Sequence, residues 1–105
     1  METNNKKELQ NKIKELQDKI NELQDMIEAI LLAIPREKEA QEYYTKAYRE
    51  ATSEASRKMY SYLAEQEQLH EATLRKRLEE LQQELVDTKI KQGLESMKLK
   101  GERGG

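Results

Sequence analysis

The sequence contains no cysteine, no tryptophan and no phenylalanine, and only one proline and four glycines among its 105 residues. Without cysteine, the chain forms no disulfide and offers no thiolate ligands for zinc, an iron–sulfur cluster or a four-cysteine iron site. Scarce aromatic and turn-forming residues, together with 38% charged residues, are typical of long helices and coiled coils. We therefore expect an all-α protein. Because a chain of this length can bury only a thin core, we also expect it to associate with partner chains.

The chain also lacks an excess of one charge and a long hydrophobic run. Its 19 basic and 21 acidic residues are interspersed and give a net charge of −2, so the sequence predicts no nucleic-acid partner. The most apolar stretch, "MIEAILLAI" at residues 26–34, is too short to span a membrane and includes Glu28. With no secretory hydrophobic segment, we expect no membrane partner and a cytoplasmic location.

The first third of the chain carries a regular heptad pattern. Its apolar residues recur at alternating intervals of four and three, at Leu9, Ile13, Leu16, Ile20, Leu23, Ile27, Ile30 and Ile34. This spacing places them on one side of a helix and predicts a coiled-coil-like segment over residues 1–34. The seam either pairs with a second chain or folds back on the next helix.

Pro35 is the one strong helix breaker in the sequence. The heptad frame nevertheless continues past it, and Pro35 falls at an outward position of that frame. A true loop would have no reason to preserve the phase, so the pattern favours one long helix kinked at Pro35. A tight break at this position is the alternative.

The stretch "ATSEAS", residues 51–56, predicts a turn, because its hydroxyl side chains can cap a helix that begins near Glu54. The second helix is expected to end near Gln92, with Gly93 either as its C′ cap residue or as a weak point before "LESMKLK". The predicted organisation is an N-terminal helix at 1–34, a long antiparallel helical hairpin at 35–92 and a flexible C-terminal tail at 93–105.

Charged residues interrupt the apolar seams of both predicted helices. Glu37 occupies a seam position in the first helix, and the seam of the second reads Met59, Leu63, Glu67, His70, Leu74, Leu78, Leu81 and Leu85. Moving a carboxylate out of water costs roughly several kcal/mol of free energy, unless a proton, a cation or a metal compensates its charge. Glu and His three residues apart share a helix face, so both can bind one ion.

This ligand set has a known use in helical bundles. Di-iron and di-manganese carboxylate proteins take a Glu from each of two helices and a Glu-x-x-His from each of the other two. One copy of this chain supplies Glu37 and the pair Glu67 and His70, which is half of that set. Two copies would complete four helices, and the stoichiometry predicts a dimer with metals at its interface.

Two segments resemble a known family. "EKEAQEYY", residues 37–44, and "LAEQEQLH", residues 63–70, are similar to the rubrerythrin-like branch of the ferritin-like superfamily, whose helices read roughly E-x-x-A-x-x-x-Y and L-A-x-x-E-x-x-H. Because this chain has one helical pair, it most resembles the encapsulated ferritin-like, or half-ferritin, proteins. The resemblance implies a ferritin-like four-helix bundle formed on dimerisation, with the ferroxidase centre between subunits and the dimers associated into rings.

The resemblance implies roles for five residues. Glu37, Glu67 and His70 match the metal ligands and catalytic residues, shared across two chains. Tyr44 matches an aromatic residue beside the metal site, and Glu39 matches a carboxylate near a metal-access path.

The implied reaction is ferroxidase chemistry: two Fe(II) ions are oxidised by O2 or peroxide, and Fe(III) is released for storage or detoxification. The implied cofactor is a di-iron centre, with manganese or zinc as substitutes. An encapsulin-type shell is a further candidate partner, which would place the protein inside a nanocompartment. Two alternatives stay open: a metal-free coiled-coil oligomerisation protein, and a metal scavenger that binds without turnover.

Overall fold

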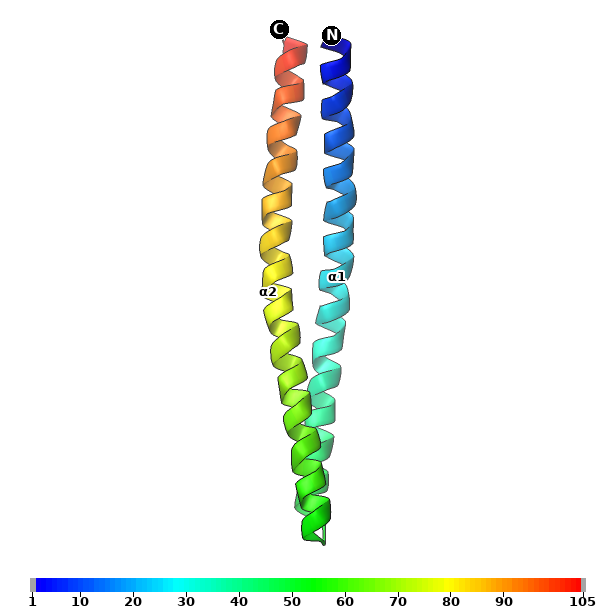
Figure 1. The fold of residues 1–105 in the computed structure, drawn as a ribbon, viewed down its shortest axis with the longest axis vertical. Helices are drawn as coiled ribbons and strands as arrows, with labels where there is room; N and C mark the ends of the chain where they lie inside the picture. The colour runs from blue at the N-terminus through cyan, green and yellow to red at the C-terminus, as the bar shows by residue number, and fades with distance from the viewer. Residues whose placement is uncertain (1, 105) are drawn as a thin grey trace. The chain divides into compact units, whose positions relative to one another are not determined.

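A computed structural model describes residues 2–104 of the chain, with side chains for residues 5–101. Two helices account for nearly all of this range: α1 spans Glu2–Glu50 and α2 spans Glu54–Gly104 (Figure 1). No strand is present among residues 2–104, which confirms the predicted all-α class. Within the same range, neither helix contains a segment long and apolar enough to cross a membrane.

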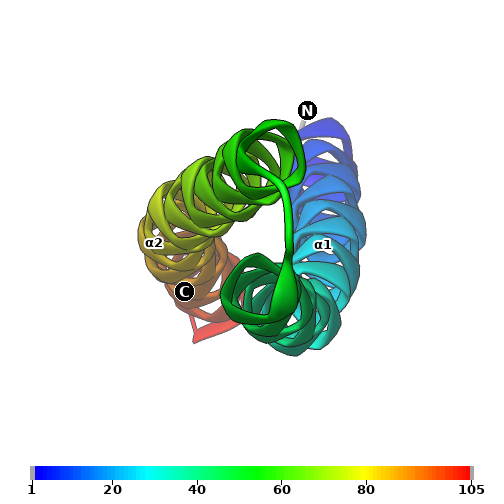
Figure 2. The same ribbon diagram turned by 90° about the horizontal axis from the view of Figure 1, so that it is seen from below.

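A three-residue connection at 51–53 joins the two helices, as the end-on view in Figure 2 shows. Ser53 caps α2, because its Oγ accepts a hydrogen bond from the backbone N–H of Ser56 at 3.1 Å. The Arg57 Nε also donates to the Ala51 carbonyl at 3.3 Å and so ties the first turn of α2 to the connection. A cap of this kind contributes about 1 kcal/mol, and it confirms the predicted turn and the helix start at Glu54.

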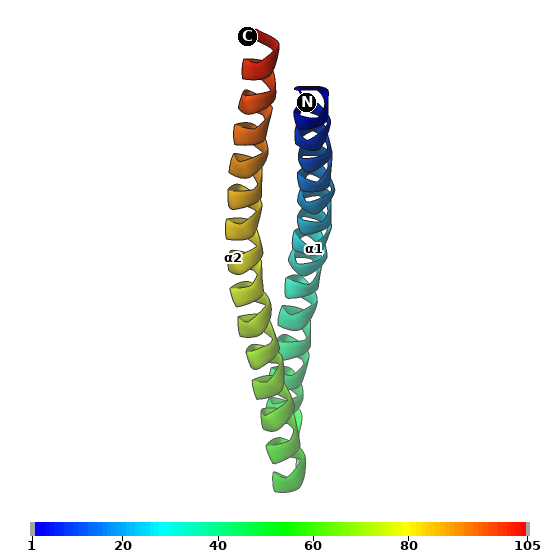
Figure 3. The same cartoon turned by 45° about the horizontal axis from the view of Figure 1, so that its top comes forward.

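The chain divides into two compact units. The hairpin unit is Glu28–Glu79, in which α1 and α2 run in opposite directions and are closed by the connection. The terminal unit is Met1–Ile27 with Glu80–Gly105, in which the first part of α1 lies beside the last part of α2 (Figure 3). The functional residues discussed below all belong to the hairpin unit.

The predicted heptad seam is the packing surface of α1. In the terminal unit, Ile20 and Leu23 of α1 and Leu81 of α2 are buried. The other seam positions of α1 are buried or half-buried, which confirms the seam. Since α2 of the same chain covers these side chains, the seam folds back on the second helix. Each fully buried leucine contributes roughly 1.5 to 3 kcal/mol of hydrophobic stabilisation.

Polar residues continue this packing surface toward the end of α2. The Gln92 amide donates to the Ile13 carbonyl at 3.4 Å and to the Gln17 Oε1 at 2.9 Å, which links α2 to α1. Thr88 is buried and satisfies its hydroxyl by donating to the Glu84 carbonyl at 2.7 Å. These bonds extend the contact between the helices beyond the leucine-rich part of the seam.

Helix α1 passes through Pro35 without interruption, which confirms the predicted continuity. Proline lacks the N–H that would bond to the carbonyl four residues earlier, and it costs roughly 3 kcal/mol inside a helix. Pro35 lies on the exposed side, whereas Ile34 before it is buried and Glu37 after it is half-buried. Packing of these neighbours holds the helix together. The division of the chain at Pro35 into an extension and a hairpin stays a prediction.

The predicted end of the second helix is wrong. Helix α2 does not stop at Gln92 but continues to Gly104, so residues 93–104 are helical, and residue 105 lies outside the described residues. No glycine among the described residues has a positive φ, so Gly93 does not form the left-handed cap that was expected. The bonds of Gln92 to α1 and the half-buried Leu99 offset the cost of a helical glycine.

The predicted seam of α2 needs two further corrections. His70 is exposed, and Glu71 takes the half-buried position one turn after Glu67. Met59 is exposed, and Tyr60 takes the half-buried position one turn before Leu63. Steps of three and of four residues both keep a side chain on one helix face, so spacing alone did not distinguish the two positions.

Replacing Gly93 with alanine tests the corrected end of α2. A Cβ at this position meets nothing within 4 Å, so we expect the substitution to raise the free energy of unfolding by about 0.5 to 1 kcal/mol. Urea unfolding followed by circular dichroism measures it. Gly101→Ala in the last turn is the control and should have a smaller effect. A loss of stability in Gly93→Ala would indicate a left-handed glycine instead.

Candidate metal centre

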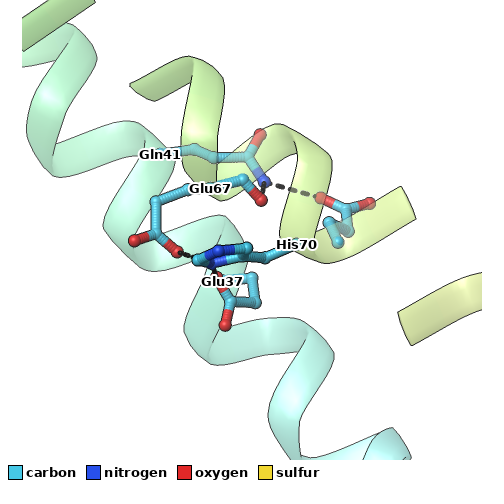
Figure 4. A network of polar contacts seen from close by, with 5 residues as sticks. Glu37, Gln41, Glu67 and His70 are labelled. Atoms are coloured by element: carbon cyan, nitrogen blue, oxygen red, sulfur yellow. Dashed lines mark hydrogen bonds and ion pairs between the residues drawn. The ribbon is translucent and has the colours of Figure 1, made fainter. Parts of the chain in front are cut away.

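Antiparallel packing in the hairpin unit brings three predicted site residues together. Glu37 comes from α1, and Glu67 and His70 come from consecutive turns of α2 (Figure 4). Each offers one ligand atom, and the three atoms lie within 4.8 Å of one another. The sequence prediction that these residues share one site is thus met in the geometry of a single chain, while their role as metal ligands stays a prediction.

The spacing of the three donor atoms suits a metal ion. The His70 Nδ1 lies 3.6 Å from the Glu37 Oε2 and 3.5 Å from the Glu67 Oε2. These distances exceed those of good hydrogen bonds, which are about 2.7 to 3.2 Å. Octahedral metal–ligand bonds of about 2.1 Å would separate donor atoms by roughly 3 to 4.2 Å, which includes both distances.

The Glu37 carboxylate supplies a second indication. Its Oε2 is buried and has no hydrogen-bond partner. A buried polar atom without a partner costs about 1 to 3 kcal/mol, and a cation bound between the carboxylates would satisfy it. Two carboxylate oxygens and one imidazole nitrogen are a donor set that suits iron, manganese or zinc.

The site lies at the surface of the hairpin unit. The His70 side chain is 57% exposed, whereas those of Glu37 and Glu67 are 23% and 21% exposed. The imidazole therefore stands toward solvent and the carboxylates lie beneath it. Three donor atoms are fewer than the roughly six that octahedral ions take, so further ligands can approach from the open side.

Glu67 perturbs the carboxylate of Glu37. The proximity of Glu67, through hydrogen bonding, raises the pKa of Glu37 above its ordinary value of 4.5. Burial and the negative charge of Glu67 raise it further, while His70 opposes the shift. Like charges close together favour the state in which one carboxyl group keeps its proton, unless a cation neutralises both.

A second polar group beside the site was not predicted from the sequence. The Gln41 Nε2 donates to the Glu71 Oε1 at 2.8 Å and, at 3.5 Å, to the Glu67 carbonyl. The Arg75 Nε donates to the other oxygen of Glu71 at 2.7 Å. Arg75 first, and Gln41 next, lower the pKa of Glu71. The sequence feature that could have indicated this pair is its spacing, because Gln41 follows Glu37 by one turn and Glu71 follows Glu67 by one turn.

The remaining two predicted site residues do not join the group. Tyr44 is half-buried on α1 and packs edge-to-face on Tyr43, with ring centroids 5.4 Å apart. Its Cα lies about 10 Å along the helix axis from that of Glu37, because seven residues rise about 1.5 Å each. Glu39 is exposed, and residues two apart on a helix do not face the same way. The roles of Tyr44 and Glu39 stay predictions.

An antiparallel helical pair that brings together one glutamate and a Glu-x-x-His pair carries half of the ligand set of the ferritin-like di-metal bundles. In agreement, the protein-family model described as Rubrerythrin matches residues 28–100, which is more than half of the chain. The chain belongs to the rubrerythrin family, a ferritin-like family, which confirms the resemblance to the rubrerythrin-like branch. The closer likeness to the half-ferritin proteins stays a prediction. No curated protein and no solved structure matches the chain significantly.

The raised pKa of Glu37 predicts a pH dependence of the metal-free protein. The folded state holds this proton more tightly than the unfolded state, so the Glu37 contribution to stability is present below pH 4.5 and is lost as the pH rises through the folded pKa. In Glu37→Gln the residue cannot ionise, and we expect a flatter decline in stability with rising pH. Urea midpoints in the presence of a chelator measure the difference.

Glu39→Gln is the matched control, because Glu39 is an exposed carboxylate on the same helix. It should keep the pH dependence of the unsubstituted protein, because Glu37 and the groups that face it from α2, Glu67 and His70, are unchanged. If the stabilities of Glu37→Gln and Glu39→Gln decline alike with rising pH, folding does not raise the pKa of Glu37 as described.

Proposed function

We propose that the protein is a ferroxidase of the half-ferritin type, which binds Fe(II) as substrate between two copies of the chain. The observation that carries the proposal is the convergence of Glu37, Glu67 and His70 in a member of the rubrerythrin family. The buried Oε2 of Glu37 has no hydrogen-bond partner and lies 3.6 Å from the His70 Nδ1; it supports the proposal, because a divalent cation there would compensate both carboxylates.

Each residue has a defined task in this proposal. The carboxylates of Glu37 and Glu67 neutralise the charge of hard cations and can bridge two of them, and His70 adds a nitrogen ligand. Bound iron supplies the redox chemistry: two Fe(II) ions each give up one electron, which together reduce O2 to hydrogen peroxide or peroxide to water, with two protons taken from solvent. The open side of the site leaves room for the oxidant.

A second copy of the chain would complete the ligand set. One chain offers two glutamates and one histidine, half of the set used by di-metal carboxylate bundles. The 57% exposure of His70 leaves it accessible to a facing subunit. Leu32, Tyr62 and Leu69 of the hairpin unit are large exposed apolar side chains that pairing could cover. We extend this proposal to a ring-like assembly of several dimers and to a surrounding encapsulin-type shell.

The two alternatives differ in support. A scavenger without turnover would use the same three side chains, so only a turnover measurement separates it from the ferroxidase. A metal-free oligomerisation coil has less support, because the heptad seam from Leu9 to Ile34 is covered by α2 of its own chain. That seam therefore leaves no long apolar stripe of α1 free for a partner coil.

Iron oxidation by the full-length protein tests the proposal. We expect Fe(II) added in air to be oxidised over repeated turnovers, and Glu67→Ala and His70→Ala each to lower the initial rate at least about tenfold, since both remove a direct ligand. Stopped-flow absorbance of Fe(III) and elemental analysis provide the readouts. Sedimentation with and without metal reports whether two chains associate.

Glu65→Ala is the control, because Glu65 is an exposed glutamate of α2 outside the group. Its oxidation rate should match that of the unsubstituted protein. Oxidation that stops after one filling of the site would favour the scavenger. An absence of bound iron, or equal rates in His70→Ala and Glu65→Ala, would contradict the proposal.

A further inference from the structure

We propose that Gln41, Glu71 and Arg75 form a brace that positions Glu37 and Glu67 for metal binding and keeps the Glu71 carboxylate out of the ligand set. This inference rests on the proposed function, because it assigns positioning residues to the same metal site. Neither Gln41 nor Glu71 belongs to the group of three candidate ligands.

The brace connects the two helices directly beside the ligands. Gln41 lies one turn beyond Glu37 on α1, and its amide donates across to Glu71, one turn beyond Glu67 on α2, at 2.8 Å. The same amide lies 3.5 Å from the carbonyl of Glu67 itself (Figure 4). Gln41 therefore holds the next turn of the segment that carries Glu67, and its hydrogen bond to the Glu67 carbonyl is long and weaker.

Helix geometry places the brace and the histidine on opposite sides of Glu67. In a helix of 3.6 residues per turn, position i+3 falls about 60° to one side of position i, and position i+4 falls about 40° to the other. His70 is at i+3 and Glu71 is at i+4 from Glu67. The Glu67 side chain is thus set between the imidazole on the open side and the brace on the other.

Arg75 determines which carboxylates are available to a metal. Glu71 is only 18% exposed and lies one turn after Glu67, so an unpaired Glu71 would leave a third carboxylate without a cation on this part of α2. Both of its oxygens are occupied instead, one by Gln41 at 2.8 Å and the other by Arg75 at 2.7 Å. The guanidinium also cancels the Glu71 charge. The site therefore presents two carboxylates rather than three.

Gln41 is a polar residue on the packing surface of α1, and its polarity there supports a positioning role. Gln41 is half-buried on α1, one turn after Glu37. It lies seven residues after Ile34, at the heptad position that isoleucine occupies in the preceding repeats. An apolar residue would bury more hydrophobic surface at this position. A glutamine that makes hydrogen bonds to the ligand-bearing helix gives up some of that packing and holds the alignment of the two helices.

Co(II) binding by the full-length protein provides the test, since the absorption spectrum of bound Co(II) reports the arrangement of its ligands independently of iron oxidation. Gln41→Leu keeps a side chain of similar size and removes both hydrogen bonds to α2. We expect it to weaken Co(II) binding by about tenfold to a hundredfold, as other substitutions beside metal ligands do, and to change the spectrum of the bound ion. Metal-free helix content should be unchanged.

Two substitutions at Glu71 separate positioning from simple packing. Glu71→Gln keeps an oxygen that accepts the hydrogen bond of Gln41 and should retain most of the affinity. Glu71→Leu removes that acceptor and should bind as weakly as Gln41→Leu. If Gln41→Leu fails to fold, equal affinities of Glu71→Gln and Glu71→Leu would overturn the brace.

Gln83→Leu is the matched control, because Gln83 makes a 3.0 Å hydrogen bond to Asp87 within α2, in the terminal unit. It should bind Co(II) like the unsubstituted protein. If the unsubstituted protein binds Co(II) and Gln41→Leu binds it equally with the same spectrum, the brace is wrong and the metal site stands. If the unsubstituted protein binds no Co(II), or Glu67→Ala binds it equally, the proposed function fails together with the brace.

Discussion

The antiparallel packing of α1 on α2 is the interaction that assembles the candidate site, because no helix alone carries more than part of it. Glu37 and the pair Glu67 and His70 are thirty residues apart in the sequence and meet only when the two helices align within the hairpin unit. The alignment must hold to within one residue, since a shift of one position rotates a side chain about 100° around its helix. The contacts between the helices are therefore also the contacts that position the donor atoms.

Apolar and polar contacts contribute differently to this alignment. Burial of leucine and isoleucine side chains contributes strongly to stability but does not fix the register of the two helices, because a seam of similar residues can pack in neighbouring registers. Specific hydrogen bonds discriminate between registers. The Gln92 amide does so in the terminal unit, with Gln17 as its partner, and the Gln41 amide does so beside the site, with Glu71 as its partner. Both bonds link α2 to α1 through glutamine side chains.

The site itself opposes folding in the absence of a cation. Two carboxylates lie close together, the pKa of Glu37 is raised, and its Oε2 has no hydrogen-bond partner. Such an arrangement persists because the packing on either side of it supplies enough stability to offset the cost. A bound divalent cation would convert the same repulsion into attraction, so the electrostatic cost of the site and the proposed chemistry have one physical origin.

Local periodicity and side-chain chemistry were enough to predict the helical class, the seam of α1, the turn at 51–56 and the grouping of Glu37, Glu67 and His70. The packing of the two helices was needed to learn that α2 continues through Gly93, that Tyr60 packs in place of Met59, and that Gln41 reaches Glu71. Those outcomes depend on residues far apart along the chain. A glycine ends or continues a helix according to what lies opposite it, and a glutamine finds its partner only after two helices have aligned.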